Sequence, residues 1–442
     1  MAEKKKKAVL GSLQPNVDPL LELNSLTAAD FAPASSDEKE DFIQQRKSVS
    51  YWADAWRRLR KNVVAMVALG VIVLLVLFAF VGPLLVPYTN TGFNQGAENL
   101  YPWHYSLEAQ RAYAEATAAQ DPDEAVEAAR AEAEANGEEF TSKDAALIRA
   151  QIRAGGSEKY EGMTEAQIYK ELGYSPQPFG YSLDELERIE AGEKVFPHIF
   201  GTDRYGRDIL VRTMIATRVS MIIGLAAALI VLIIGSIYGS ISGFFGGTVD
   251  VVMQRIVDVI YSLPDVLIIL LISTAMSPHV TQFITDHQGN PLAEFFKTVG
   301  PNLIGMFIAF ACLYWVGLSR IIRGQILTLK KQEYVTAARA LGASGPRIIK
   351  KHLLPNCIGQ IVVTTCLQIP SAIFLESFLS FLGVGVLAPM TSLGSMCSDA
   401  LGGINTYPYR LIIPAIIISV MILAFNLFGD GLRDALDPRL KK

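Results

Sequence analysis

The sequence predicts an all-α integral membrane protein with six transmembrane helices and a long acidic helical insert between the first and the second. Of the 442 residues, 51% are hydrophobic, and the mean hydropathy is +0.31. The hydrophobic residues gather into blocks of about 20 or more, which is the length that an α-helix needs to cross a bilayer with its backbone groups bonded internally. Six such blocks run approximately over residues 63–86, 219–243, 256–276, 301–319, 357–386 and 410–428.

The amino-terminal region divides into a tail and an anchor. Residues 1–47 are polar, aperiodic and contain proline, so we expect a disordered cytoplasmic tail. Residues 48–86 contain an aromatic helix with four basic residues and then the first span, which predicts an interfacial helix feeding a membrane anchor. Because basic residues flank cytoplasmic ends, we expect the amino terminus inside.

Residues 87–200 form the predicted extracytoplasmic insert. Between Tyr88 and Phe200 there are 21 acidic and nine basic residues. Helix-start signals and glycine stops alternate along it. Docking of an external protein and a role as a solvated spacer or shield are equally compatible with this composition. The predicted helices run from Asp121 to Gly137, Thr141 to Gly155, Thr164 to Gly173 and Ser182 to Gly192.

Residues 201–442 carry the other five spans. The third span contains Asp258, Pro264 and Asp265. A charged side chain facing lipid costs on the order of 2.5–3.5 kcal/mol, so these acids should face protein or water, and Pro264 should kink the helix. The fourth span should end at Arg320. From there to Lys351, eight basic residues and one acid predict a cytoplasmic loop at about 320–356, and two further crossings place the carboxyl terminus inside.

This loop has its own predicted architecture. Glu333 to Leu341 reads as a short helix that ends at Gly342, because glycine adopts the left-handed conformation of a helix end without strain. Ser344 should cap a second helix, with Pro346 in its first turn and Pro355 at its end. Small side chains at Ala337, Ala338, Ala340 and Ala343 leave room for close approach by another surface.

The pattern resembles the cytoplasmic loop of ABC importer permeases, which runs E-A-A, three residues, Gly, nine residues, then I-x-L-P. Thr336 and His352 depart from it, standing where the family has Glu and Ile, and Glu333 lies one turn earlier as a substitute. The resemblance implies that the loop couples this chain to an ATPase. The implied coupling residues are Glu333, Tyr334, Thr336, Ala337, Ala338, Arg339, Gly342, Ala343, Ser344, Leu354 and Pro355.

Three further segments are similar to the dipeptide, oligopeptide and nickel branch of these permeases, and to its oligopeptide C-type subunit in particular. They are GTDRYGRD at 201–208, SLGSMCSD at 392–399, with Leu393 where many members have Trp, and the ending from Ala424. We expect the last span to break at Gly429 and continue as an amphipathic helix.

Polar residues in the fifth span are candidates for lining a translocation pathway, with helix–helix hydrogen bonding as the alternative for each. The four cysteines have no metal-ligand spacing, so they should be small apolar fillers, and we expect no metal site. The candidate pathway residues are Thr364, Thr365, Gln368, Ser371 and Glu376.

The sequence has no G-x-x-x-x-G-K-[ST] phosphate loop and no catalytic constellation, so we expect no enzyme activity and no cofactor in this chain. The resemblance implies a permease subunit of a binding-protein-dependent ABC importer in a bacterial cell membrane, with ATP and magnesium held by partners. Those partners would be a second homologous permease, two ABC ATPases, an extracytoplasmic substrate-binding protein and membrane lipid, without nucleic acid. Oligopeptide is the predicted cargo. Dipeptide or nickel import, an ATPase-independent secondary transporter and a non-transporting scaffold remain the alternatives.

Overall fold

The computed structural model describes residues 50–117, 163–388 and 390–436, together with 126, 127, 130, 133, 141, 143 and 145. The predicted tail at 1–47, the helix signals at 121–124 and 136–137 and most of the segment 141–155 lie outside these residues. The chain divides between Asp54 and Ala55 into two units. Apart from α3 (Tyr51–Leu59), which contains that boundary, the elements below belong to the second unit.

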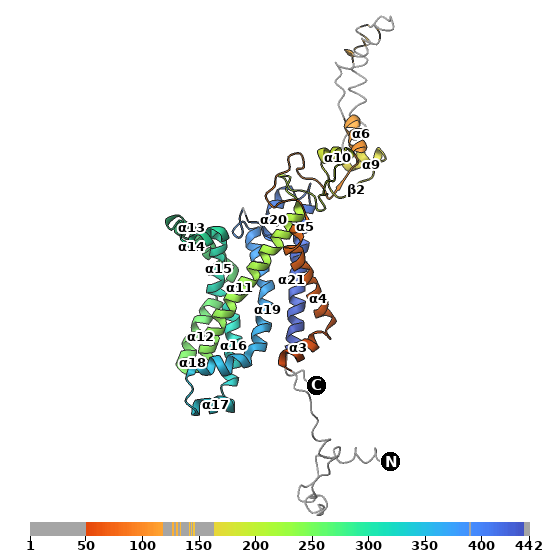
Figure 1. Ribbon diagram of the computed structural model, residues 1–442. Coiled ribbons are helices and arrows are strands. Elements are labelled where there is room, and N and C mark those ends of the chain that lie inside the picture. Colours follow the sequence, from red (N-terminus) through yellow and green to blue (C-terminus); the bar gives the residue numbers. More distant parts are fainter. Residues whose placement is uncertain are drawn as a thin grey trace, which may run out of the picture. The chain divides into compact units, whose positions relative to one another are not determined.

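Within the described residues, six helical stretches are long and apolar enough to cross a membrane, so the predicted fold class is confirmed (Figure 1). The chain remains helical through most of each stretch because apolar side chains predominate and each backbone group finds its partner within the segment. The stretches are α4 (Val63–Phe80), α11 (Ile209–Phe245), α13 (Asp265–Asp286), α15 with α16 (Pro301–Leu313 and Trp315–Leu329), the stretch from α18 (Gly345–Ile348) to α19 (Ile358–Phe381), and α21 (Tyr409–Leu436).

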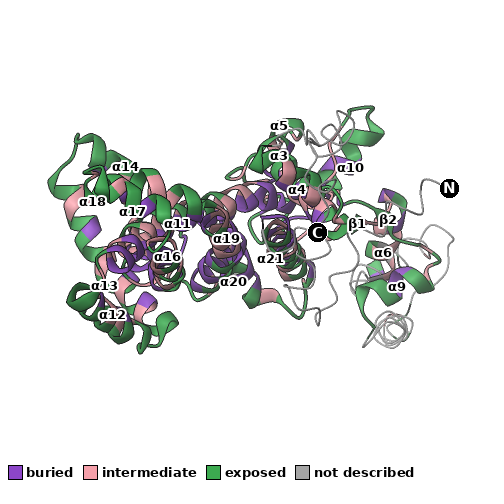
Figure 2. Cartoon of the chain, turned by 90° about the horizontal axis from the view of Figure 1, so that it is seen from below, coloured by how far each residue is buried: buried purple, intermediate pink, exposed green. Residues whose placement is uncertain are grey.

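Helix α11 is the centre of the packing. It lies along α16 and α19, α19 contacts α21, α21 packs on α4, and α13 packs on α15. Buried residues gather between these helices, while many large apolar side chains on their outer faces are exposed, as expected for surfaces that meet lipid or another chain (Figure 2). The shorter helices in this part are α5 (Gly82–Leu85), α12 (Gly247–Tyr261), α14 (Pro291–Val299), α17 (Glu333–Ala340) and α20 (Leu393–Ala400).

A glycine stripe explains how closely α11 and α16 approach. Gly235, Gly239 and Gly243 recur at every fourth position, on one face of α11. A Cβ atom at Gly239 would lie 2.4 Å from the carbonyl oxygen of Ser319, which is closer than atoms can approach. Small residues at this spacing allow two helix backbones to come together in a membrane protein.

The predicted boundaries of the third span were wrong. The segment 256–276 is not one kinked helix, because α12 ends at Tyr261 and α13 begins at Asp265. Pro264 precedes α13 in an extended conformation, and proline lacks the N–H that a continuous helix requires. Asp258 lies on α12 and accepts a hydrogen bond from Arg320 at 2.8 Å, so this acid is paired.

Two other predicted helix ends were also wrong. Helix α16 continues beyond Arg320 to Leu329, and α21 runs without interruption through Gly429. A Cβ atom at Gly429 would lie 2.7 Å from Cδ2 of Leu367. This glycine therefore permits contact between α21 and α19 instead of ending the helix.

The described part of the insert holds three helices and one pair of short strands. Thr164 and Ser182 precede α9 and α10 as predicted: the Gln167 side chain accepts from Thr164 N–H at 2.8 Å, and Glu185 accepts from Ser182 N–H at 2.8 Å. The antiparallel strands were not predicted, because two residues per strand are too few to show an alternating pattern. The elements are β1 (Trp103–His104), α6 (Leu107–Thr117), α9 (Glu165–Glu171), β2 (Gln177–Pro178) and α10 (Leu183–Glu190).

Candidate functional site

The loop that carries the sequence motif contains the predicted short helix, α17. Gly342 has φ +81°, its N–H donates to the Arg339 carbonyl at 2.9 Å, and Ala343 N–H donates to the Ala338 carbonyl at 3.0 Å. These are the two bonds of a Schellman motif, which satisfies the last carbonyls of a helix and requires a left-handed residue. The prediction that Gly342 ends this helix is confirmed.

The two sides of α17 differ in what they contact. Val335 is fully buried, and Ala338 and Ala343 pack against the same apolar cluster, which includes residues of α11 and α16. On the other side Leu341 is 88% exposed. The exposed residues of α17 and its end are Glu333, Tyr334, Thr336, Ala337, Arg339, Ala340 and Leu341.

The second half of the loop differs from the prediction. Ser344 occupies the N-cap position of α18, but its side chain makes no capping hydrogen bond. Pro355 does not end the helix: the chain passes from α18 through one wide turn at Ile349–Leu353 and one tight turn at Leu354–Cys357 directly into α19. Leu354 N–H donates to the Ile349 carbonyl across the wide turn. Such a turn re-registers the hydrogen bonds around a proline that has no N–H to offer.

Polar contacts brace this loop against the membrane helices. Arg323 of α16 donates two hydrogen bonds to Asp250 of α12, at 2.5 and 2.6 Å. These bonds hold the pKa of the Asp250 carboxyl below its usual range. Lys330 donates to the Gly243 carbonyl at 2.7 Å, and the Arg339 guanidinium lies 5.2 Å from the ring centre of Phe244. The loop is thus fastened to the end of α11 that carries the glycine stripe.

Two of the five candidate pathway residues line a cavity of about 540 Å³ between the α12–α13 break, α16 and α19. They are Gln368, which donates to the Tyr314 carbonyl at 3.5 Å, and Ser371. Thr364, Thr365 and Glu376 do not line it. The other lining residues are Ile260, Tyr261, Leu263, Pro264, Asp265, Leu313, Tyr314, Val316 and Gly317.

Glu376 is instead fully buried at a junction of three helices. Its carboxyl accepts hydrogen bonds at 2.8 Å from Ser220 of α11 and from Ser380 of α19. Ser220 also lies 3.5 Å from the N–H of Leu393, where α20 begins. Thr365 donates back to the Ile361 carbonyl at 2.8 Å, which is bonding within its own helix. Glu376 therefore makes the helix–helix hydrogen bonds that were the alternative to lining a pathway, whereas Thr365 bonds only its own helix.

The aromatic and acidic wall of the cavity was not predicted. Tyr261 and Asp265 line the cavity from the two sides of the break between α12 and α13, and Tyr314 lines it from the junction of α15 and α16. The signal available in the sequence was Ser262-Leu263-Pro264-Asp265, a helix stop followed by a helix start. The prediction of one kinked span over these residues did not indicate a cavity.

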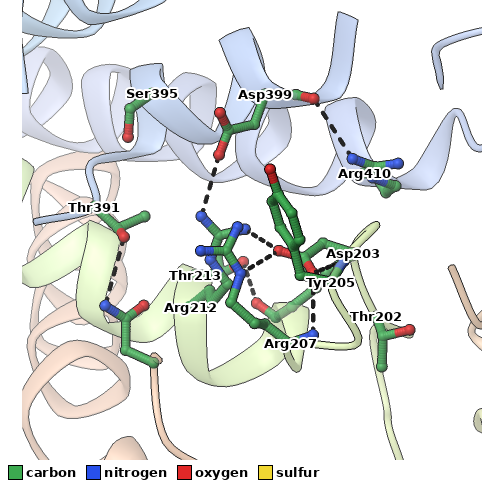
Figure 3. Close-up of polar contacts among 12 residues, drawn as sticks. Thr202, Asp203, Tyr205, Arg207, Arg212, Thr213, Thr391, Ser395, Asp399 and Arg410 are labelled. Atoms are coloured by element: carbon green, nitrogen blue, oxygen red, sulfur yellow. Dashed lines mark hydrogen bonds and ion pairs between the residues drawn. The ribbon is translucent and has the colours of Figure 1, made fainter. Parts of the chain in front are cut away.

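The G-T-D-R-Y-G-R-D segment forms a tight entrance to α11. Gly201 and Gly206 have φ of +74° and +70°, and Asp208 caps the helix by accepting from Val211 N–H at 2.9 Å. Asp203 accepts from Arg207 at 2.7 Å and from Arg212 at 2.5 Å (Figure 3). The segment therefore fixes the start of α11.

A buried histidine joins this entrance to the insert. His198 is fully buried, with Nδ1 2.7 Å from Asp208 and Nε2 3.3 Å from Glu185 of α10. Burial alone would lower the pKa of His198, but the hydrogen bonds to the two carboxylates raise it to about 9. The Tyr88 ring stacks on the imidazole at 4.4 Å.

Two family profiles match the chain. Residues 235–442 match the family described as binding-protein-dependent transport system inner membrane component, and residues 50–102 match the N-terminal TM domain of oligopeptide transport permease C. The first match contains α16 to α21 and the motif loop, and the second contains α3 and α4.

Curated relatives agree with these profiles. The chain is 34% identical over 399 residues to the dipeptide transport system permease protein DppC of Bacillus subtilis, covering 90% of this chain and 89% of the relative. It is 33% identical to DppC of Lactococcus lactis, covering 89% and 92%. It is 41% identical over 245 residues to the oligopeptide transport system permease protein OppC of Bacillus subtilis, covering 55% and 73%.

Proposed function

The chain belongs to the inner-membrane components of binding-protein-dependent transport systems, in the branch of the oligopeptide and dipeptide permeases, and from this premise we propose how it works. It is a multi-pass permease subunit of an ABC peptide importer; a secondary transporter or a scaffold is not favoured. We propose that it pairs with a second, homologous permease. Two separate ATPase subunits hydrolyse ATP with magnesium, and an extracytoplasmic binding protein delivers the peptide.

The exposed side of α17 carries the proposal for energy coupling. On the exposed side of α17, Leu341 and Ala337 present an apolar surface with small protrusion, which a partner can contact closely. On the opposite side, Val335 and Ala338 pack the same helix onto the apolar cluster. A partner that moves α17 therefore moves the ends of α11 and α16 with it. Coupling requires that the ATPases bind this surface better in one state of the permease than in the other.

The cavity between α12, α16 and α19 is the proposed part of the translocation pathway. Its volume of about 540 Å³ and its mixed wall of tyrosine, amide, hydroxyl and apolar groups fit a cargo that carries many hydrogen-bonding groups and varied side chains. We propose that the homologous permease completes the pathway.

The basic loop supports the membrane orientation that we propose. With α17 and both termini in the cytoplasm, the insert and the α11 entrance lie outside. The insert is fastened there: Tyr409 donates to the Leu100 carbonyl at 2.7 Å, and Arg410 donates to Asn99 at 3.0 Å. A fastened insert disfavours a loose spacer and suits either docking or a shield over the mouth; we propose docking of the binding protein.

Copurification tests the coupling proposal. The chain is isolated from detergent-solubilised native membranes, bound proteins are identified by mass spectrometry, and ATPase activity is measured. Ala337→Glu on exposed α17 should abolish copurification of the ATPases, while Ala191→Glu on the exposed end of α10 serves as the control. A chain that purifies alone and still moves solute would contradict the proposal.

Oligopeptide is the proposed cargo, supported by the matches to oligopeptide permease proteins at up to 43% identity. Competition among labelled dipeptides, tripeptides and pentapeptides for uptake by the assembled transporter separates oligopeptide from dipeptide transport. Preferential uptake of dipeptides, or uptake of nickel, would reject oligopeptide as the cargo.

A further inference from the structure

A second, smaller cavity lies at the entrance of α11, between the start of the insert and α20. Its volume is about 170 Å³, and its wall combines polar and apolar residues. It is separate from the proposed pathway cavity, and the two share no lining residue. Its polar lining includes Asn90, Arg207, Arg212, Ser395, Ser398 and Asp399.

Arg212 lines this cavity, and one of its three guanidinium nitrogens has no hydrogen-bond acceptor within the part of the chain that the structure describes. Its side chain is buried, with only 4% of the residue exposed. Nη1 donates to Asp203 at 2.5 Å and Nη2 lies 3.3 Å from Asp399, but Nε has no acceptor among the described residues (Figure 3). A buried donor without an acceptor is costly and rare in folded proteins, so it indicates a partner from outside the chain.

The charge around the cavity favours a single negative charge. Arg207 and Arg212 pair with the carboxylates of Asp203 and Asp399. Arg410 instead donates to the backbone carbonyl of Asp399 and to Asn99, and it has no carboxylate partner among the described residues, which leaves one positive charge over in this group. A monoanion would balance it. A dianion such as phosphate would leave one negative charge in excess, beside two carboxylates.

Hydroxyl and amide groups complete a set of donors. The Ser398 hydroxyl lines the cavity and has no hydrogen bond within the described chain. Asn90 lies 3.5 Å from the Thr391 hydroxyl, and its Oδ1 is without a donor. A 180° flip of the Asn90 side-chain amide lets the Thr391 hydroxyl donate to Oδ1 and directs Nδ2 toward the cavity.

We propose that this cavity binds a carboxylate group, held by Arg212 Nε together with Arg207 and Ser398. A carboxylate is a planar monoanion that accepts several hydrogen bonds, which matches both the fork of an arginine and the charge of the site. On the proposed function of peptide import, the carboxylate is the free carboxyl terminus of a peptide arriving from the binding protein. The cavity then orients the cargo at the outer face.

The test uses the chain assembled with its partner subunits in lipid nanodiscs, without ATP and without the binding protein. The midpoint of thermal unfolding is followed against sodium acetate, with sodium chloride at equal ionic strength as reference. Arg212→Lys keeps a cation for Asp203 but replaces Nε by a methylene, and Ser398→Val keeps every ion pair. Arg204→Lys, on the exposed neighbour in the same segment, is the matched control.

The proposal expects acetate to raise the unfolding midpoint in a saturable way for the wild type and for Arg204→Lys. The half-saturating concentration should rise about tenfold or more in Arg212→Lys, as expected for the loss of one hydrogen bond to a charged group. If that variant does not assemble, Ser398→Val decides. Two results would overturn the site: no saturable effect beyond chloride in the wild type, or half-saturating concentrations in Arg212→Lys and Ser398→Val that both equal the wild-type value.

A second arm identifies the source of the carboxylate. A tripeptide with a free carboxyl terminus should stabilise the assembly and compete with acetate, whereas the same tripeptide as its amide should not. Equal effects of the two peptides, or none from either, would overturn the assignment to cargo. ATP-dependent peptide uptake by the wild type is measured separately, so a failed site and a failed importer assignment are distinguishable.

Discussion

Replacement of Gly342 by valine should uncouple ATP hydrolysis from transport without preventing membrane insertion. The residue has φ +81°, and a Cβ atom added there meets nothing within 4 Å, so the effect of the substitution is conformational and not steric. The left-handed conformation costs an L-residue about 1–2 kcal/mol. That is about a five- to thirtyfold change in the population of the intact helix end. Uptake of labelled peptide per ATP hydrolysed, measured in proteoliposomes with the whole assembly, should fall accordingly.

The matched control places the same strain elsewhere. Gly173 has φ +86° and equally open surroundings, but it lies in the insert. Gly173→Val should leave uptake per ATP unchanged, and Gly342→Asn should retain more coupling than Gly342→Val, because asparagine tolerates the left-handed region. Equal coupling ratios in Gly342→Val, Gly173→Val and the wild type would refute the argument that this helix end transmits the motion.

Three further predictions concern packing and pH. Ala338→Glu would place an unpaired carboxylate against the apolar cluster beneath α17, so it should lower the unfolding midpoint of the purified chain, whereas exposed Ala337→Glu should not. Gly239→Leu should reduce the amount of folded chain in membranes, because overpacking costs about 1–3 kcal/mol. Gly70→Leu should not reduce it, because a Cβ atom added at Gly70 meets nothing within 4 Å. Equal amounts of the two folded variants would contradict the close helix contact. Because the pKa of His198 is raised from 6.5 to about 9, its ion pairs should stabilise the insert fully below pH 6.5, and this stabilisation should be lost as the pH rises to about 9. Proteolysis of the insert should therefore become faster over this pH range. A proteolysis rate that does not depend on pH, or the same pH dependence in His198→Gln, would contradict the prediction.

The parts that the sequence predicted well are governed by local physics. The end of α17 at Gly342 depends on one residue and its own helix, and the helix starts after Thr164 and Ser182 depend on side chains three residues apart. The six spans follow from composition alone. Each of these signals is complete within about 20 consecutive residues or fewer.

The parts that were wrong depend on contacts between distant segments. Gly429 reads as a helix stop, yet its role is set by Leu367 of another helix. Arg320 reads as the end of a span, yet α16 continues to Leu329, and Arg320 pairs with Asp258 of α12. The unused donor of Arg212 becomes visible only when its partners from α20 and the entrance segment are in place, so the sequence could not indicate the small cavity.

The central claim, that this chain moves peptide only as the permease of an ATP-driven assembly, has a direct test. The assembly is reconstituted into proteoliposomes with the binding protein on its outer face, and uptake of a labelled oligopeptide is measured with and without ATP on the cytoplasmic face. The account predicts uptake against a gradient that requires ATP, the binding protein and an intact α17 surface, and that disappears in Ala337→Glu. Uptake at the same rate without ATP, or by the purified chain alone, would contradict it.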